Sequence, residues 1–62
     1  MLIKNLKREL DKKGISLYRL AKLTGIRYEL LRRTFNEKRK LRTDEFIKIL
    51  STCNLKYEEV KE

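Results

Sequence analysis

The stretch LAKLTGIRYELLRRTFN, residues 20–36, decides the fold of this 62-residue chain. Gly25 stands in the middle of an otherwise helix-prone run, and three arginines follow it. Two helices joined by a turn of three or four residues can cross steeply and pack closely when the positions at the crossing stay small. Ala21 and Gly25, four residues apart, satisfy this condition. We therefore expect a helix on each side of Gly25 and close packing between Gly25 and Ala21.

The first half of the chain predicts three helices. Apolar residues recur at spacings of three and four, and no run alternates with a period of two as a half-buried strand would. The first helix is expected from about Leu2 to Lys13, with Gly14 as its C-terminal stop. Ser16 precedes the next apolar pattern and is expected to cap a short helix from Leu17 to about Leu23. A third helix is expected from Arg27 to Phe35.

The second half predicts one clear helix and a short closing turn. Asn36 tolerates left-handed backbone and is expected to end the third helix. Thr43 is expected to cap the fourth helix, with Asp44 and Glu45 in its first turn. The apolar stripe of that helix comprises Phe46, Ile49, Leu50 and Cys53. A turn from Tyr57 to Val60 follows. The sequence thus predicts an all-α fold, a compact bundle of four to five short helices in one domain over residues 1–62.

Composition limits the classes of function. A chain of 62 residues builds a small core with little room for a catalytic cleft, so we expect no enzyme. Seventeen Lys and Arg against nine Asp and Glu give a formal charge of +8, which favours a polyanionic partner such as nucleic acid or an anionic membrane surface. No apolar stretch is long enough for a membrane span or a signal peptide. A single cysteine favours a reducing cytoplasm.

The central stretch resembles the helix-turn-helix of the Cro and phage-repressor family, often called the Xre class. Leu20-Ala21, Gly25-Ile26 and Leu31 match its internal positions, and "FNEKRK" resembles its loop after the second helix of the motif, which often reads "NGKR". The motif covers about residues 17–36, and the resemblance extends over nearly the whole chain. It implies a lambda-repressor-like DNA-binding domain.

Three positions depart from that family's pattern. Leu17 stands where a glutamine or another polar residue often touches phosphate, so Ser16 or Arg19 is expected to substitute. Glu37 stands where glycine is usual and places a carboxylate near the DNA backbone, although the neighbouring cations outweigh it. Thr34 stands where an apolar residue is common, which leaves more of the packing to Phe35.

The third helix carries the expected base contacts. In such a domain this helix lies in the major groove. If Ile26, Leu30, Leu31 and Phe35 face the core, the helical period sends five residues outward: Arg27, Tyr28, Glu29, Arg32 and Arg33. Arginine pairs bidentately with guanine and glutamate accepts from the amino group of cytosine, so half-sites containing G·C pairs are favoured. The alternative is a solvated charged face on which Glu29 pairs with Arg32 or Arg33.

The loop after this helix carries the expected phosphate contacts. It holds four cations in the seven residues 36–42. The expected phosphate ligands, besides Ser16 and Arg19, are Asn36, Lys38, Arg39, Lys40, Arg42 and Thr43. The alternative is a solvated charge run. Lys4, Lys7 and Lys12 are expected to be solvating residues, and Tyr18 either packs or touches phosphate.

The sequence favours no catalytic or metal chemistry. Cys53 continues an apolar stripe and is interpreted as a core residue. A chain with no histidine and one cysteine predicts no metal site, and we expect no cofactor. The pairs Asp44-Glu45 and Glu58-Glu59 are interpreted as helix-dipole chemistry rather than an acid–base pair.

The function that these patterns favour is a sequence-specific double-stranded DNA-binding regulator, a Cro-like repressor that acts by occupying an operator. The alternative is a protein-interaction module, such as an antitoxin or adaptor, which exposed apolar residues on the third helix would favour. RNA binding lacks the interleaved aromatic residues that stack on bases. A weak homodimer formed on DNA is expected to use a small surface: Leu41, Leu55, Tyr57 and Val60.

Overall fold

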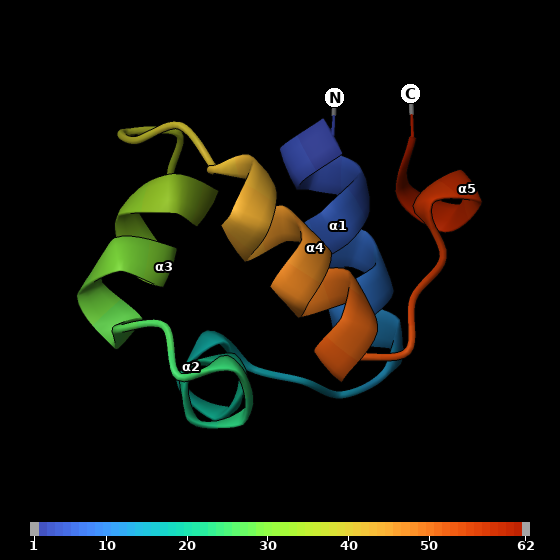
Figure 1. The fold of residues 1–62 in the computed structure, drawn as a ribbon, viewed down its shortest axis with the longest axis horizontal. Coiled ribbons are helices and arrows are strands. Elements are labelled where there is room, and N and C mark those ends of the chain that lie inside the picture. The colour runs from blue at the N-terminus through green and yellow to red at the C-terminus, as the bar shows by residue number, and fades with distance from the viewer. Residues whose placement is uncertain (1, 62) are drawn as a thin grey trace.

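Five short helices form the chain in the computed structural model, which describes residues 2–61. They are α1 (Leu2–Lys12), α2 (Leu17–Thr24), α3 (Tyr28–Phe35), α4 (Thr43–Thr52) and α5 (Tyr57–Val60). Figure 1 shows α3 and α5 on opposite sides of the α1 and α4 pair, with α2 below them. The helix pairs that pack on each other include α2 with α3 and α4, and α1 with α3 and α5. The predicted all-α bundle is confirmed.

The core contains one or two buried apolar residues from each helix. Its buried members are Leu6, Leu10, Leu20, Leu31, Ile49, Cys53, Leu55 and Val60. Each fully buried Leu or Ile side chain contributes about 1.5–3 kcal/mol relative to an exposed one. Leu6 and Leu10 of α1 and the stripe predicted for α4 face the core, and Cys53 is a core residue as expected.

The turn between α2 and α3 requires glycine for its backbone conformation. Gly25 has a φ of 77° and its N–H donates to the carbonyl of Ala21 at 2.9 Å. A Cβ added at Gly25 would meet no atom within 4 Å, so the expected close packing against Ala21 is wrong. Glycine is required here because Gly25 adopts a left-handed backbone conformation, which residues with a Cβ disfavour. The hydroxyl of Thr24 accepts from the N–H of Ile26 at 3.2 Å and completes the turn.

The turn after α3 places a left-handed residue one position later than expected. Asn36 has a φ of −91°, whereas Glu37 has a φ of 61°. The N–H of Lys38 donates to the carbonyl of Arg33 at 2.8 Å. This hydrogen bond is typical of the Schellman motif, in which the residue after the C-cap is left-handed. Asn36 ends α3 as its C-cap, as predicted, but the left-handed geometry expected of it is found at Glu37 instead. Glu37 occupies the conformation that a glycine would adopt most readily.

Three helices begin with side-chain caps. The hydroxyl of Ser16 accepts from the N–H of Arg19 at 3.1 Å, which confirms Ser16 as the cap of α2. At α4 the expected cap, Thr43, is instead the first helical residue, and the N–H of Arg42 donates to the carboxylate of Glu45 at 3.1 Å. At α5 the N–H of Lys56 donates to Glu59 at 2.8 Å. Glu45 and Glu59 thus cap helices, in agreement with the interpretation of the acidic pairs.

The closing segment is tied to the first helix. The side-chain amide of Asn5 donates to the carbonyls of Val60 at 3.1 Å and Lys61 at 3.2 Å. Leu55 is 6% exposed and Val60 is fully buried. Both belong to the core, so their expected place in a dimer surface is wrong. None of the helices in the described residues 2–61 is long and apolar enough to cross a membrane.

Candidate nucleic-acid interface

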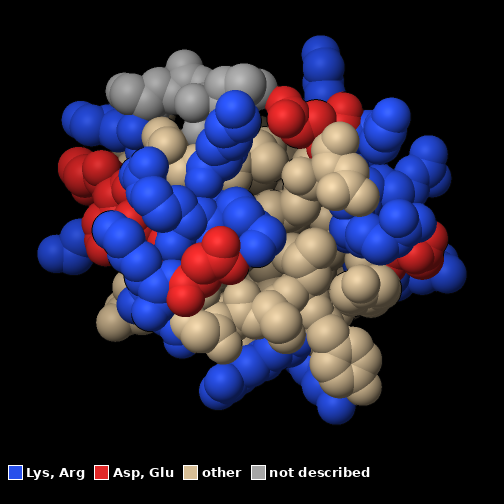
Figure 2. Space-filling model, turned by 180° about the vertical axis from the view of Figure 1, so that it is seen from behind, with Lys and Arg blue, Asp and Glu red and all other residues tan. Residues whose placement is uncertain are grey.

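Positive charge covers much of the surface. Figure 2 shows, on the face opposite to that in Figure 1, two regions of Lys and Arg separated by a band of uncharged side chains. One of these regions belongs to α1 and the other to the end of α3 and the loop that follows it. A formal charge of +8 on so small a protein creates a positive field that attracts a polyanion.

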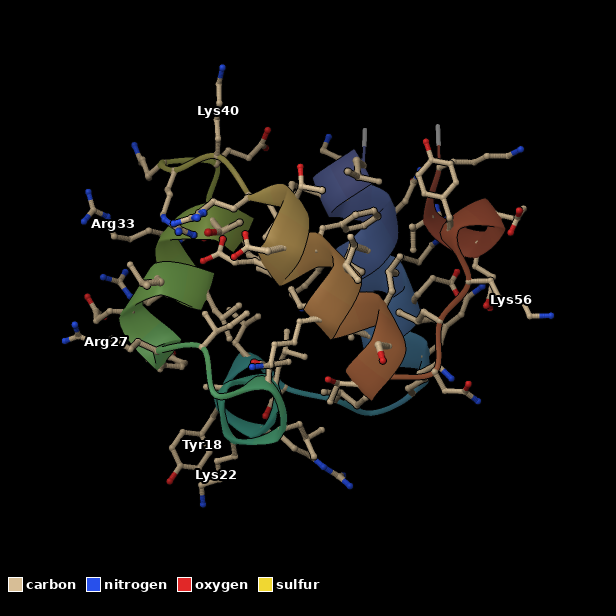
Figure 3. All side chains as sticks on the ribbon, viewed as in Figure 1. Tyr18, Lys22, Arg27, Arg33, Lys40 and Lys56 are labelled. Atoms are coloured by element: carbon tan, nitrogen blue, oxygen red, sulfur yellow. The ribbon has the colours of Figure 1, made fainter. Side chains whose placement is uncertain are left out.

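The outward face of α3 is highly exposed and mostly basic. Leu31 and Thr34 are buried on the inner face, and the five residues predicted to point outward are all exposed. Figure 3 shows Arg27, the N-cap residue of α3, and Arg33, within α3, projecting on the side away from α4. Within residues 2–61, neither of these two arginines makes an ion pair. Their guanidinium groups are free to donate to a ligand.

Glu29 and Arg32 bind each other on the same face. Nε of Arg32 donates to one carboxylate oxygen of Glu29 at 3.0 Å and Nη2 to the other at 3.1 Å. These hydrogen bonds hold the pKa of the Glu29 carboxyl below its usual value. The sequence allows a second interpretation of this face, in which Glu29 pairs with an arginine one turn away. In the free protein this interpretation holds for Glu29 and Arg32. It does not describe Arg33.

Two tyrosines join α2 to the outward face of α3. The rings of Tyr18 and Tyr28 meet edge to face, with centroids 6.4 Å apart and an interplanar angle of 66°. The ammonium of Lys22 lies 4.6 Å from the centroid of Tyr18, a cation–π geometry visible in Figure 3. Tyr18 is 62% exposed, so it packs against Tyr28 while remaining open to a ligand. The sequence alone did not decide whether Tyr18 packs or touches a ligand, because its contact with Tyr28 depends on how α2 and α3 cross.

Arg39 is held inside the protein and differs from the other loop cations. Its Nη1 donates to the hydroxyl of Thr34 at 2.9 Å and to Glu45 at 3.0 Å, and its Nη2 donates to Glu45 at 2.8 Å. The side chains of Arg39 and Glu45 are 23% and 13% exposed. Arg39 lowers the pKa of the Glu45 carboxyl by this hydrogen bonding. A guanidinium that makes three internal hydrogen bonds is a poor phosphate ligand, so Arg39 is not among the proposed phosphate contacts.

The network explains why Thr34 replaces an apolar residue. Thr34 is fully buried, and its hydroxyl donates to the carbonyl of Leu30 at 2.7 Å while it accepts from Arg39. Phe35 is half-buried and packs against the core, as expected. The signal that sequence reasoning missed is a buried hydroxyl, an arginine and a helix-capping glutamate within twelve residues.

The remaining predicted phosphate ligands are exposed. Lys38 and Lys40 make no ion pair within the described part of the chain, and Arg42 lies 3.3 Å from Asp44 with both side chains about 70% exposed. Ser16 accepts a capping hydrogen bond, which leaves its hydroxyl proton available for a ligand. The other exposed members of the set are Arg19, Asn36 and Thr43.

Comparison with known proteins identifies the family. A family model described as a Cro/C1-type HTH DNA-binding domain matches residues 5–61. No curated protein and no solved structure matches the chain. The match includes α2, the Gly25 turn, α3 and the loop that follows, the elements that carry the exposed cations. The chain therefore belongs to the Cro/C1-type HTH DNA-binding domain family, and its family implies DNA binding.

Proposed function

We propose that this protein is a sequence-specific transcriptional regulator, a Cro-like repressor that acts by occupying a double-stranded DNA operator. The observation that carries the proposal is the pair of free guanidinium groups, Arg27 and Arg33, on the exposed face of the helix that enters the major groove in this family. The exposed positions of α3 read bases. The exposed loop cations Lys38, Lys40 and Arg42 fix the register on phosphates.

Two further assignments complete the proposed interface. Tyr28 and the Glu29–Arg32 pair lie on the same face of α3 as the free arginines and join them in base contact. Ser16 and Arg19 at the start of α2, with Asn36 and Thr43 beside the loop, supply the other phosphate contacts. Residues 1–62 act as one cytoplasmic helix-turn-helix domain in this proposal, with no catalytic residues.

The geometry favours DNA over a protein partner for α3. A protein-interaction module would expose several apolar side chains on this helix. Among the described residues, Tyr28 is the one large hydrophobic residue of α3 that is exposed, at 43%. The surrounding arginines suit a charged partner.

Assembly is proposed to occur on DNA. With Leu55 and Val60 in the core, the expected dimer surface retains the exposed Tyr57 and the half-buried Leu41. A surface this small falls well below the area that stable interfaces bury, so DNA must contribute the remaining affinity.

Selection of bound sequences from a random duplex library tests the proposal. The expected result is inverted half-sites that contain G·C pairs, with centres about 10 base pairs apart or a multiple of that spacing. A single asymmetric half-site would refute the dimer, and the absence of any enriched sequence would refute specific recognition.

Two substitutions on the selected site separate base reading from phosphate binding. Arg33→Ala should weaken binding by about 1–3 kcal/mol and relax the preference at one or two positions, because a bidentate base contact carries sequence information. Lys38→Ala, a matched loss of one unpaired cation, should weaken binding to every sequence and lower the salt slope by about one. If Arg33→Ala behaves like Lys38→Ala, α3 does not read bases through Arg33.

A further inference from the structure

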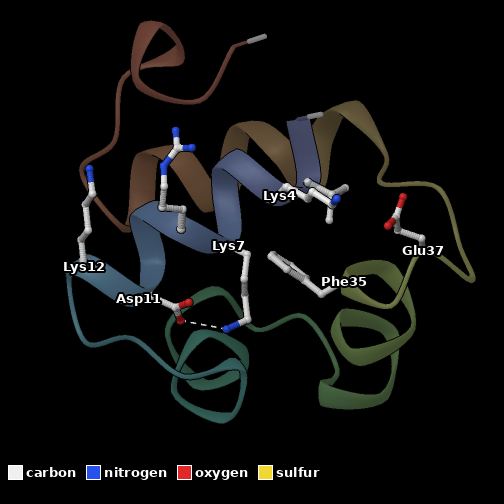
Figure 4. A pocket seen from close by; sticks show the side chains of 8 residues that line it. Lys4, Lys7, Asp11, Lys12, Phe35 and Glu37 are labelled. Atoms are coloured by element: carbon white, nitrogen blue, oxygen red, sulfur yellow. Dashed lines mark hydrogen bonds and ion pairs between the residues drawn. The ribbon is translucent and has the colours of Figure 1, made fainter.

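A second surface lies outside the proposed DNA interface. A groove runs between α1 and the end of α3, and its apolar floor includes Ile3 and Phe35. Figure 4 shows Phe35 projecting from the end of α3 toward α1. The groove continues past Ile3 and Glu37 to Leu41 in the loop.

The rim of the groove is strongly basic. Lys4, Lys7, Arg8 and Lys12 line it from α1, and Lys38 and Lys40 line it from the loop. Two carboxylates lie among them, Asp11 and Glu37, and Asp11 is already bound to Lys7 at 2.8 Å. Within residues 2–61, three of the rim cations make no ion pair: Lys4, Lys38 and Lys40. The rim therefore keeps a clear excess of positive charge.

We propose that this groove docks an acidic amphipathic helix of a partner protein. The apolar floor matches the apolar stripe of such a helix, and its carboxylates complement the rim on both sides. The groove follows α1, which has 11 residues and is about 16 Å long, so the partner helix needs about eleven residues. Duplex DNA satisfies the rim but not the floor, because a phosphate backbone would cover Ile3 and Phe35 without burying an apolar surface of its own.

The groove and the proposed base-reading face are distinct. Ile3 and Lys4 belong to α1, whereas Arg27 and Arg33 project from α3 on the side away from the body of the protein. Lys38 and Lys40 border both surfaces. The test therefore uses the residues of α1, which separate the two activities.

A displayed library of random 12-residue peptides, selected on the purified protein, identifies ligands of the groove. The expected result is enrichment of peptides that combine several Asp or Glu residues with apolar residues at helical spacing. Binding of one enriched, fluorescein-labelled peptide is then measured by anisotropy against four variants. Ile3→Ser and Lys4→Glu should each weaken peptide binding at least about fivefold. The first removes an apolar side chain from the floor of the groove, and the second reverses one charge on its rim. The matched controls Ile47→Ser and Lys48→Glu, exposed residues of α4, should change it less than about twofold.

Three results would overturn the proposal. The first is that selection on the Lys4→Glu protein enriches the same acidic peptides equally well. The second is a peptide whose binding ignores Ile3→Ser, since that would show charge attraction without docking on the floor. The third is a loss of non-specific duplex binding in Lys4→Glu, with a lower salt slope, which would assign this surface to nucleic acid. Folding of each variant is checked by its thermal midpoint.

Discussion

The two ends of α3 are held in different ways. At its beginning, a glycine with a φ of 77° and the hydroxyl of Thr24 make the turn, and the arginines beyond it stay free. At its end, Glu37 adopts a φ of 61° without the advantage of glycine, and a half-buried network of Thr34, Arg39 and Glu45 ties the loop to α4. The beginning presents side chains to a ligand, whereas the end uses one of its cations to hold the loop.

This difference shows that neighbouring cations in a basic run are not equivalent. Lys38, Arg39 and Lys40 are consecutive, yet only Arg39 is turned inward. An arginine fork can bind a carboxylate and a hydroxyl together, which a lysine ammonium does with less geometric control. The loop thus gains a fixed shape from Arg39 and keeps its charge for a ligand on the two lysines.

Replacing the glycine at the beginning of α3 should have the largest effect on stability. Gly25→Val should lower the free energy of unfolding by about 2 kcal/mol, because a β-branched residue is strained at positive φ. Gly25→Ala should cost about 1 kcal/mol. Chemical denaturation measures both.

Gly14→Val is the matched control for this turn. Gly14 has a φ of 71° and, like Gly25, open space around the position of a Cβ. If the backbone conformation alone matters, the two valine variants should lose similar stability. A much larger loss at Gly25 would show that close packing is required there after all.

Breaking the network at the other end should have a smaller effect that depends on pH. Arg39→Met removes the hydrogen bonds that lower the pKa of Glu45. A carboxyl with a lowered folded pKa adds stability above its unfolded pKa, near 4.5, and loses it as the pH falls through the folded pKa. The thermal midpoint of Arg39→Met should therefore fall furthest below the wild type at neutral pH, and the gap should narrow as the pH falls below 4.5.

Lys40→Met is the control for Arg39→Met, because it removes an exposed cation one residue away. Its midpoint should stay close to that of the wild type at every pH. A gap for Arg39→Met that does not change with pH would mean that the Arg39–Glu45 pair does not stabilise the fold through its charge.

Relieving the strain at Glu37 should raise stability modestly. Glu37→Gly removes the cost of a left-handed side chain but increases the entropy of the unfolded chain, so a net gain of about 0.5–1 kcal/mol is expected. Glu58→Gly, at a helical position of α5, should lower stability instead. A loss in Glu37→Gly, measured by chemical denaturation, would show that the side chain of Glu37 stabilises the loop.

The sequence predicted what depends on local pattern. The apolar spacing located all five helices to within one or two residues, and the cap at Ser16 and the burial of Cys53 followed from their neighbours. It failed where contacts between different elements decide the outcome. The inward turn of Arg39 depends on Glu45, and the burial of Leu55 depends on how the closing segment folds back, a path that the amide of Asn5 secures. The free arginines of α3 could be placed on its outward face, but their DNA contacts stay a prediction.

The smallest expected effect on stability separates two ways of using the Glu29–Arg32 pair. Both side chains are exposed, so Glu29→Gln, Arg32→Ala and the double variant should leave the thermal midpoint almost unchanged. Their selected DNA sequences should differ from those of the wild type. If Glu29 holds Arg32 in position for one base, each single variant relaxes the same operator position and the double variant adds nothing further. If the pair opens and each residue reads its own base, the single variants relax different positions and the double variant relaxes both. Since two hydrogen bonds close to 3 Å hold the pair together without DNA, we expect the first pattern. Unchanged preferences in all three variants would leave Arg27 and Arg33 as the readers of the sequence and the pair as a surface contact.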